Sequence, residues 1–189
     1  MSKNIVMLGL PGVGKGTNAD IMVEDFKLPH ISTGDIFRSA MANHTELGDK
    51  AKSFMDAGNL VPDEITNGIV NERLNEADVK DAGGFILDGY PRNTSQADSL
   101  ESFLRSIQQK LNAVIYLDAS EKTVTNRMLG RGREDDTPEV VAHRIDVAKK
   151  KPCPWLNIIV IKEVFTRLMQ MEKFQLFIQR LKNLFQIYK

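Results

Sequence analysis

The chain has few of the residues that cross-link a protein or anchor it. Its 189 residues include a single cysteine, Cys153, which cannot form an internal disulfide bond. No cluster of cysteine and histidine has the spacing of a structural zinc site, so no zinc is expected. No apolar run reaches the ~18 residues that span a bilayer, and the first residues lack the apolar segment of a signal peptide. These absences predict a reduced, cytoplasmic protein that has no membrane partner.

Neither positive nor negative charge is in excess. Lys and Arg together number 25, Asp and Glu together number 25, and the formal net charge is zero. A balanced chain has no general attraction to nucleic acid or to anionic membranes, although it can still hold a local basic pocket. The length is sufficient for one domain with a sizeable core. We expect a single domain over 1–189, a monomer, and no nucleic-acid partner.

Short apolar runs alternate with longer helical patterns, which is typical of βαβ units and a parallel sheet. Strands are predicted at 5–8, 85–88 and 113–118, and each is apolar nearly throughout, as a strand buried on both faces should be. Helices are predicted at 14–26, 33–42, 46–57, 63–76 and 95–109. Ligands of open α/β sheets bind at the carboxyl ends of the strands. The predicted fold class is therefore α/β, with chemistry at one edge of the sheet.

A glycine-rich segment follows the first predicted strand and opens the first predicted helix. Phosphate oxygens need several converging donors, and glycines let the backbone curl so that its N–H groups point inward. The helix N-terminus adds a partial positive charge and Lys15 adds a full one. The pattern G-x-x-x-x-G-K-[ST] fits through Lys15 and then meets Gly16, with Thr17 one place later. A phosphate-binding loop is favoured over a glycine-rich turn without function.

Two further segments each carry an arginine next to turn residues. The first runs Thr-Gly-Asp-Ile-Phe-Arg from Thr33 to Arg38, and the second runs Asp-Gly-Tyr-Pro-Arg from Asp88 to Arg92, directly after a buried strand. Guanidinium groups suit bidentate phosphate binding. In the alternative interpretation, Thr33 or Asp35 caps a helix and Arg38 is a solvated surface charge.

Arginines are also dense near residue 130. Arg127, Arg131, Arg133 and Arg144 surround a Gly-Arg-Gly-Arg-Glu-Asp-Asp-Thr run. Phosphoryl transfer needs positive charge around the migrating group and exclusion of water, and a closing loop with arginines supplies both. The alternative is a salt-bridged helical surface, since three acidic residues stand close by.

Taken together, these motifs resemble those of adenylate kinases of the short-lid bacterial type, in the nucleoside monophosphate kinase family of P-loop proteins. The matching patterns are G-x-P-G-x-G-K-G-T, T-G-D-x-x-R, D-G-[FY]-P-R and R-G-R-x-D-D-T…R. The resemblance implies a three-layer P-loop fold with a central parallel sheet, a helical AMP-binding insert at 30–61 and a short lid at 130–136. It also implies reversible transfer of the terminal phosphoryl group of MgATP to AMP, giving two ADP, as in adenine nucleotide homeostasis.

The same resemblance assigns roles residue by residue. It implies that the catalytic residues are Lys15, Arg92, Arg131, Arg133 and Arg144. Among these, Lys15 would bind the donor phosphates, Arg92 the acceptor, and the other three would stabilise the transferring charge. It implies ATP contacts from Gly12, Val13, Gly14, Lys15, Gly16, Thr17, Arg127 and Arg131, with Arg127 near the base. It implies AMP contacts from Thr33, Arg38, Asn59, Leu60, Val61, Gly89, Tyr90, Pro91, Arg92, Gln96, Arg133 and Arg144. Mg²⁺, bound mainly through water, is expected beside Thr17 and Asp88.

The choice of base depends on few positions. Thr33 stands where UMP/CMP kinases typically carry Ala, and Gln96 stands where they typically carry Asn, so both favour AMP. A glutamine amide can donate to the adenine edge and accept from it. Asn93 departs from this pattern, because adenylate kinases more often carry Thr there. A UMP/CMP kinase therefore stays the alternative, while a P-loop GTPase is disfavoured because no N-K-x-D segment occurs.

The resemblance covers residues 1 to about 150 and stops at the Lys run 149–151. We hypothesise a change of reading frame there, because a shifted reading of the codons from Lys151 onward is compatible with T-L-P-L-V-E-Y-Y, which resembles the family's tail. The atypical tail, 150–189, is then expected to lack the last strand and to leave the sheet edge unpaired. Its segment 158–188 is apolar enough to form a helix instead. A catalytically impaired nucleotide-binding chain is the second alternative.

Overall fold

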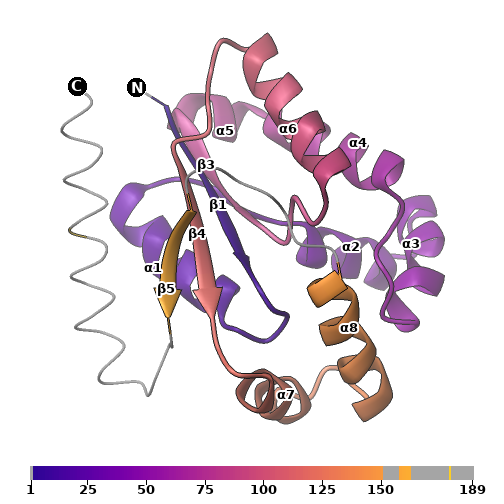
Figure 1. Cartoon of the computed structure of the whole chain (residues 1–189). Helices are drawn as coiled ribbons and strands as arrows, with labels where there is room; N and C mark the ends of the chain where they lie inside the picture. The colour runs from indigo at the N-terminus through magenta and orange to yellow at the C-terminus, as the bar shows by residue number, and fades with distance from the viewer. Residues whose placement is uncertain (1, 151–157, 163–178, 180–189) are drawn as a thin grey trace.

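A parallel β-sheet forms the centre of the molecule (Figure 1). The structure is a computed structural model and describes residues 2–150, 158–162 and 179. The strands lie in the order β2-β3-β1-β4-β5 and every neighbouring pair is parallel. Their carboxyl ends therefore share one edge. The bounds are β1 Lys3–Gly9, β2 His30–Ser32, β3 Gly84–Asp88, β4 Ala113–Asp118 and β5 Ile158–Lys162.

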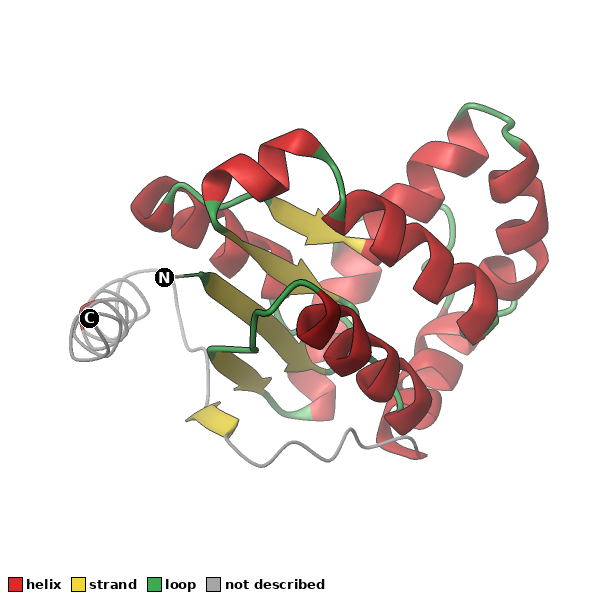
Figure 2. Cartoon of the chain, turned by 90° about the horizontal axis from the view of Figure 1, so that it is seen from above, coloured by secondary structure: helices red, strands yellow, loops and turns green. Residues whose placement is uncertain are grey.

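Helices cover both faces of the sheet, as the view from above shows (Figure 2). Alternate residues of β1 point to opposite faces, so Ile5 and Met7 join one buried core and Val6 joins the other. The described part of the chain has no helix with both the length and the hydrophobicity that crossing a membrane requires. The helices are α1 Lys15–Phe26, α2 Thr33–Ala42, α3 Glu46–Asp56, α4 Asp63–Leu74, α5 Ala77–Ala82, α6 Thr94–Ser106, α7 Glu121–Gly130 and α8 Pro138–Lys150.

The layers match the predicted three-layer α/β fold. One core lies between the sheet and α1, α7 and α8, and the other between the sheet and α4, α5 and α6. The predicted strands correspond to β1, β3 and β4, and the predicted helices to α1, α2, α3, α4 and α6. The sequence did not predict β2, α5, α7 and α8. With three and six residues, β2 and α5 are too short to show a hydrophobic period, and α7 and α8 each bury only two residues, which is a weak pattern.

The expectation of an unpaired sheet edge after β4 is wrong. Residues Ile158–Lys162 form β5, which pairs with β4 from Val114↔Ile158 to Asp118↔Lys162. The expected helix at 158–188 is also wrong over these five residues. Four consecutive β-branched residues, Ile-Ile-Val-Ile, favour an extended strand over a helix. The rest of that expected helix, apart from Gln179, lies outside the described residues.

Helices α2 and α3 lie close together beside the sheet and have a small core of their own, formed by Phe37, Ala51 and Val61. Each helix begins at a hydroxyl cap: Ser32 accepts from the backbone N–H of Asp35, and Thr45 accepts from that of Gly48. The two helices approach most closely at Gly48. A Cβ added there would lie 2.2 Å from the backbone oxygen of Ala40, which is sterically impossible without a shift.

Replacing Gly48 with alanine is therefore expected to destabilise the protein by about 3 kcal/mol, because the two helices must separate to admit the methyl group. The matched control is Gly68→Ala in α4, where nothing lies within 4 Å of the added Cβ. That substitution should stabilise the protein by about 0.5–1 kcal/mol through helix propensity. Urea unfolding of both variants measures the difference. Equal effects would show that the close approach of α2 and α3 is absent.

Candidate active site

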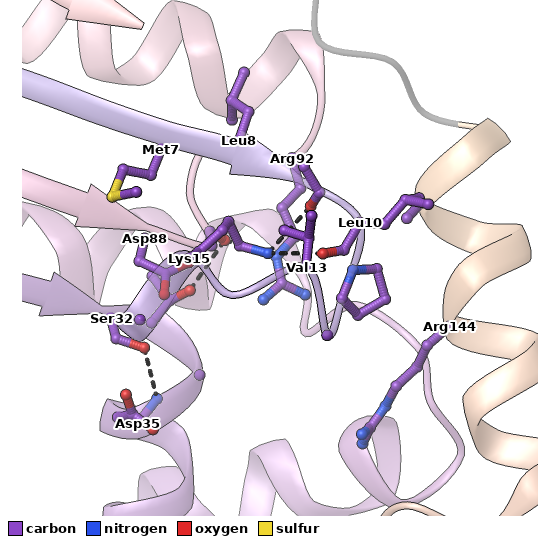
Figure 3. A pocket seen from close by; sticks show the side chains of 18 of the residues that line it. Met7, Leu8, Leu10, Val13, Lys15, Ser32, Asp35, Asp88, Arg92 and Arg144 are labelled. Carbon is purple, nitrogen blue, oxygen red and sulfur yellow. Dashed lines mark hydrogen bonds between the residues drawn. The ribbon is translucent and has the colours of Figure 1, made fainter. Parts of the chain in front are cut away.

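A cavity of about 1270 Å³ opens at the carboxyl edge of the sheet. Its walls come from the β1–α1 loop, from α2, from the segment after α3, from the β3–α6 loop and from the α7–α8 pair. Figure 3 shows Lys15, Asp35, Arg92 and Arg144 around this space. Five segments that are far apart in sequence therefore meet at one place. The cavity is lined by nearly all the predicted site residues: Gly12, Val13, Gly14, Lys15, Gly16, Thr17, Thr33, Arg38, Asn59, Leu60, Val61, Asp88, Gly89, Pro91, Arg92, Gln96, Arg127, Arg131, Arg133 and Arg144.

The β1–α1 loop adopts the curled backbone that the glycines predicted. Gly12 has φ +78° and Gly14 has φ +102°, values that L side chains rarely adopt. A Cβ at Gly12 would also lie 2.6 Å from Cγ of Met128, so the loop is packed closely on α7. Gly14 caps the N-terminus of α1 without a side-chain hydrogen bond. The helix N-terminus thus faces the cavity, where its partial positive charge suits an anion.

Lys15 places its ammonium group inside this loop. Its Nζ donates to the backbone oxygens of Gly9, at 3.1 Å, and Leu10, at 3.2 Å. Desolvation lowers the pKa of Lys15, and the charges of Arg92 and Arg131 lower it further, against the opposite effect of Asp88. Lys15 is therefore a cation among other cations, which an anion in the cavity would stabilise.

The β3–α6 loop and the start of α2 are joined by a hydrogen bond. Oγ1 of Thr33 donates to the backbone oxygen of Gly89 at 3.0 Å, and Nε of Arg92 donates to the same oxygen at 2.6 Å. The α2 cap is Ser32, so the alternative in which Thr33 or Asp35 caps this helix is wrong. Arg38 forms an ion pair with Asp35 one turn earlier. The bond to Gly89 holds Arg92 at the cavity wall, and the ion pair with Asp35 holds Arg38 there.

Arg92 is coupled to the other arginines of the cavity. Desolvation lowers its pKa, and the charges of Arg144 and Arg38 lower it further, while Asp88 acts in the opposite direction. Guanidinium groups repel one another, so a cluster of Arg92, Arg38 and Arg144 is unfavourable unless negative charge lies among them. The cavity therefore has the electrostatics of an anion site.

The turn between α7 and α8 brings two arginines onto two carboxylates. Arg131 binds Asp136 through two contacts of 2.5 and 3.0 Å, and Asp136 is almost fully buried. Arg144 donates to Asp136 at 3.0 Å, to Asp135 at 2.6 Å and to the backbone oxygen of Met55 at 3.0 Å. The sequence offered two interpretations of these arginines, a salt-bridged surface and a cationic site. The structure combines them, because the ion pairs with Asp135 and Asp136 hold Arg131 and Arg144 at the cavity.

Arg133 and Arg127 complete this side of the cavity. Desolvation lowers the pKa of Arg133, as do the charges of Arg38 and Arg131, although Asp35 and Asp135 oppose the effect. Arg127 donates from Nη1 to the backbone oxygen of Val13 at 3.1 Å and so braces the phosphate loop from α7.

Two contacts connect α8 with the end of α3. Nε2 of His143 lies 2.8 Å from Oδ1 of Asn59, and Arg144 reaches the backbone oxygen of Met55. Gly58, at φ +74°, lies against the side chains of α8, where an added Cβ would be 3.3 Å from Arg144 and His143. The segment predicted to line the AMP base therefore touches the helix that carries Arg144.

Tyr90 is the one predicted site residue that does not line the cavity. Its side chain is fully buried, and its hydroxyl lies 2.7 Å from Oδ1 of Asn67 and 3.0 Å from the backbone oxygen of Gln96. This position favours support of the β3–α6 loop from the core side over direct contact with a ligand.

Sequence reasoning missed two polar residues beside the cavity, His30 and Asp63. Nδ1 of His30 lies 3.5 Å from Asp20, and its Nε2 lies 3.8 Å from Asp88. Burial alone would lower the pKa of His30, but the carboxylates of Asp88, Asp20 and Asp35 outweigh it, so the pKa is raised. Asp63 begins α4 and binds Gln96. Neither residue stands in a motif, so only their strand-end and helix-start positions could have indicated them.

The ion pair of Asp135 predicts a pH dependence of stability. Burial raises the pKa of a carboxyl, but at Asp135 the hydrogen bond and charge of Arg144 outweigh burial and hold the pKa below its usual 3.8. A carboxyl whose folded pKa is lowered stabilises the fold above its unfolded pKa, and this contribution is lost as pH falls through the folded value. Asp135→Asn should therefore lower the free energy of unfolding equally at pH 7 and pH 5.

Below about pH 3.8 the difference between wild type and Asp135→Asn should shrink. Urea unfolding at several pH values checks this, with Glu134→Gln, at an exposed neighbouring carboxylate, as the control. A difference that stays constant down to about pH 3 would contradict the role given to the Arg144 pair.

The fold and the cavity together define a class of protein. A parallel sheet whose first strand runs through a glycine-rich loop with a lysine into a helix is the arrangement of P-loop proteins. The arginines that converge opposite this loop are the arrangement expected for phosphoryl transfer. The class is therefore that of the P-loop kinases.

Comparison with known proteins narrows the class to a family. The family model described as adenylate kinase matches residues 7–164. The chain is 98% identical over 154 residues to adenylate kinase of Oenococcus oeni, a match that covers 82% of both chains. It is 53% identical over 157 residues to the enzyme of Leuconostoc mesenteroides, covering 83% of both chains. The enzyme of Listeria monocytogenes is 45% identical over 184 residues, covering 81% of this chain and 85% of its own. The chain belongs to the adenylate kinase family.

Proposed function

We propose that this chain transfers the terminal phosphoryl group of MgATP reversibly to AMP and gives two molecules of ADP. The observation that carries the proposal is that two sets of cationic groups suited to binding phosphate line one cavity. Lys15 and the amides of its loop form one set, and Arg38 and Arg92 form the other. The charge of Arg92 lowers the pKa of Lys15, and the charge of Arg38 lowers the pKa of Arg92, so the two sets lie near each other across the cavity. Two phosphorylated substrates in that space would meet end to end.

The donor phosphates would lie at the N-terminus of α1. The ammonium of Lys15 lies in the β1–α1 loop, which lines the cavity, and Arg127 of α7 binds the backbone oxygen of Val13 in the same loop. The roles proposed here for Gly12, Val13, Gly14, Gly16 and Thr17 are contacts with ATP.

The acceptor phosphate would lie between Arg38 and Arg92. Each guanidinium can bind two phosphate oxygens at once, which fixes the direction of the acceptor. The base would lie toward Thr33, Gln96 and the segment Asn59, Leu60 and Val61, which lines the cavity beyond the arginines.

The turn at 131–136 would supply the remaining charge. During transfer, negative charge spreads over the oxygens of the migrating group, and cations already in place lower the barrier without further reorganisation. Arg131, Arg133 and Arg144 stand on this side of the cavity. The proposal needs no dedicated general base and no covalent intermediate, because positioning and electrostatics carry most of the catalysis.

The residues present fit a magnesium ion brought in with ATP. The carboxylate of Asp88 lines the cavity, and its Oδ2 would lie 3.8 Å from a Cβ added at Gly16. Thr17 adds a hydroxyl on the same side. Mg²⁺ prefers oxygen ligands and keeps several waters, so one carboxylate and one hydroxyl besides phosphate oxygens suit it. When bound, the ion neutralises charge that develops on the phosphates.

The proposal extends to the parts of the domain. We assign the AMP-binding insert to 30–61, which contains α2 and α3, and the short lid to 130–136, which connects α7 with α8. A monomer in the cytoplasm that needs no zinc is part of the same proposal. The change of reading frame near 150 stays a hypothesis, supported by an identity of 98% that covers 82% of the chain and does not continue over the remainder. The DNA sequence tests it.

The test of the function is an acceptor comparison with the full chain. ADP formation from ATP and Mg²⁺ is measured with AMP, CMP and UMP in turn. AMP should give by far the highest kcat/KM. Faster turnover of CMP or UMP would contradict the proposal. Binding of ATP and AMP without any turnover would instead identify a catalytically impaired chain.

A further inference from the structure

A buried network of hydrogen bonds surrounds the amide of Gln96, whose residue is only 1% exposed. Oε1 of Gln96 accepts from the backbone N–H of Arg92 at 2.7 Å, and Nε2 donates to Oδ1 of Asp63 at 2.7 Å. Asn93 donates to the same carboxylate, at 2.9 Å from Oδ1 and 3.1 Å from Oδ2. The oxygen of the Gln96 amide is thus bound to a donor, and its nitrogen is bound to an acceptor.

This network fixes which end of the amide is the donor. A glutamine amide can rotate by 180° and exchange its oxygen and nitrogen at little cost when each of its partners can both donate and accept a hydrogen bond. Here the exchange would place Oε1 against the carboxylate of Asp63 and Nε2 against the N–H of Arg92. Both contacts would be repulsive, and the one to Asp63 would be between a carbonyl oxygen and a charged carboxylate. Gln96 is held in one orientation.

The fixed amide still has unused hydrogen-bonding capacity, and Gln96 lines the cavity. Nε2 carries a second hydrogen and Oε1 has a second lone pair. A 6-amino purine presents an acceptor at N1 beside a donor at N6, and a 6-oxo purine presents a donor at N1 beside an acceptor at O6. For a base held in one placement, an amide that cannot exchange its ends therefore pairs with only one of these two edges.

We propose that Asp63 is a positioning residue that locks the amide of Gln96 and thereby sets the preference for AMP over a 6-oxo purine monophosphate such as IMP. This inference rests on the proposed function, because it concerns the acceptor of that reaction. The network also gives Asn93 a role: its Oδ1 accepts from the backbone N–H of Gln96 at 2.9 Å and caps α6, while its amide binds Asp63. Asn93 therefore supports Gln96 from outside the cavity.

The experiment compares variants of the full chain with AMP and IMP as acceptors. Asp63→Ala should raise KM for AMP about tenfold, as expected for one lost charge-assisted hydrogen bond, and should lower the AMP-to-IMP ratio of kcat/KM by a similar factor. The kcat at saturating AMP should change by less than about threefold, because Asp63 binds no phosphate. Dissociation constants for AMP and IMP, measured by calorimetry, give the same comparison without turnover.

Two variants separate positioning from a general effect of charge. In Asp63→Asn, Oδ1 remains and can keep the hydrogen bonds from Gln96 and Asn93 that converge on it, and only the longer contact of Asn93 with Oδ2 is lost. Because the bond to Gln96 is kept, KM and the AMP-to-IMP ratio should stay near those of wild type. Glu64→Ala removes an exposed carboxylate from the same first turn of α4 and should also change nothing. Should Asp63→Ala not fold, Asp63→Ser suits the first helical turn and is too short to reach Gln96.

The outcomes distinguish the two proposals. A wild-type chain that neither binds nor phosphorylates AMP overturns the proposed function and this inference together. A wild-type chain that prefers AMP, with an Asp63→Ala variant that keeps the KM and the AMP-to-IMP ratio, overturns only the role of Asp63, whatever happens to Tm. Equal shifts in Asp63→Ala and Glu64→Ala also overturn it, because they would assign the effect to charge at the helix terminus.

Discussion

Replacing Lys15 with methionine should lower kcat for ADP formation about a thousandfold. The ammonium group is held in the phosphate loop by two backbone oxygens and lies within reach of the charges of Asp88, Arg92 and Arg131. Methionine keeps an unbranched side chain as far as Cε and removes the ammonium group, with its charge and its two hydrogen bonds. Because desolvation already disfavours the charged form of Lys15, its loss should not lower Tm.

The control for Lys15→Met is Lys122→Met, which removes an exposed lysine from α7. Initial rates with saturating MgATP and AMP, together with thermal unfolding, measure both effects. A Lys15→Met variant with more than about a tenth of the wild-type kcat would contradict the place of the donor phosphates, since a single preorganised donor normally accounts for at least a hundredfold.

Arg133→Lys should lower kcat about a hundredfold and leave stability nearly unchanged. The substitution keeps the positive charge, so the loss would report the bidentate geometry of a guanidinium rather than its charge. Arg133 stands on the exposed α7–α8 turn, and its pKa is lowered by desolvation and by Arg38 and Arg131. No large packing contribution is removed, so Tm should stay within a few degrees.

For Arg133 the matched control is Arg105→Lys on α6, an exposed arginine that pairs with Glu101. It should be neutral for both kcat and Tm. The result that contradicts the proposal is an Arg133→Lys variant with wild-type kcat and raised KM for AMP, because that pattern belongs to a residue that binds ground state and transition state equally.

The phosphate loop could be predicted from the sequence because its geometry is local. Three glycines and a lysine within a few residues determine where the chain turns, where α1 starts and where Lys15 points. The apolar strands β1, β3 and β4 could be predicted for a similar reason, since each is uniformly apolar over several residues.

Features that depend on contacts between distant segments could not be predicted in the same way. Asp63 and Gln96 are 33 positions apart, and nothing in either neighbourhood indicates that they meet. Tyr90 belongs to a motif of the site, yet the β3–α6 loop turns its side chain into the core. The overall composition of the tail favours a helix, whereas the local β-branched run at 158–161 determines the strand β5.

Asp135 and Asp136 occupy the arginines that a phosphate would need. Under the proposed function, entry of a nucleotide into the cavity is therefore an exchange of anions, in which phosphate oxygens replace carboxylate oxygens on the guanidinium groups of Arg131 and Arg144. Such an exchange keeps the number of charge-assisted hydrogen bonds nearly constant and favours the ligand with more negative charge per group. The carboxylates thus act as weak internal competitors, which keep the site assembled between turnovers and give way to polyphosphate more readily than to a singly charged ion.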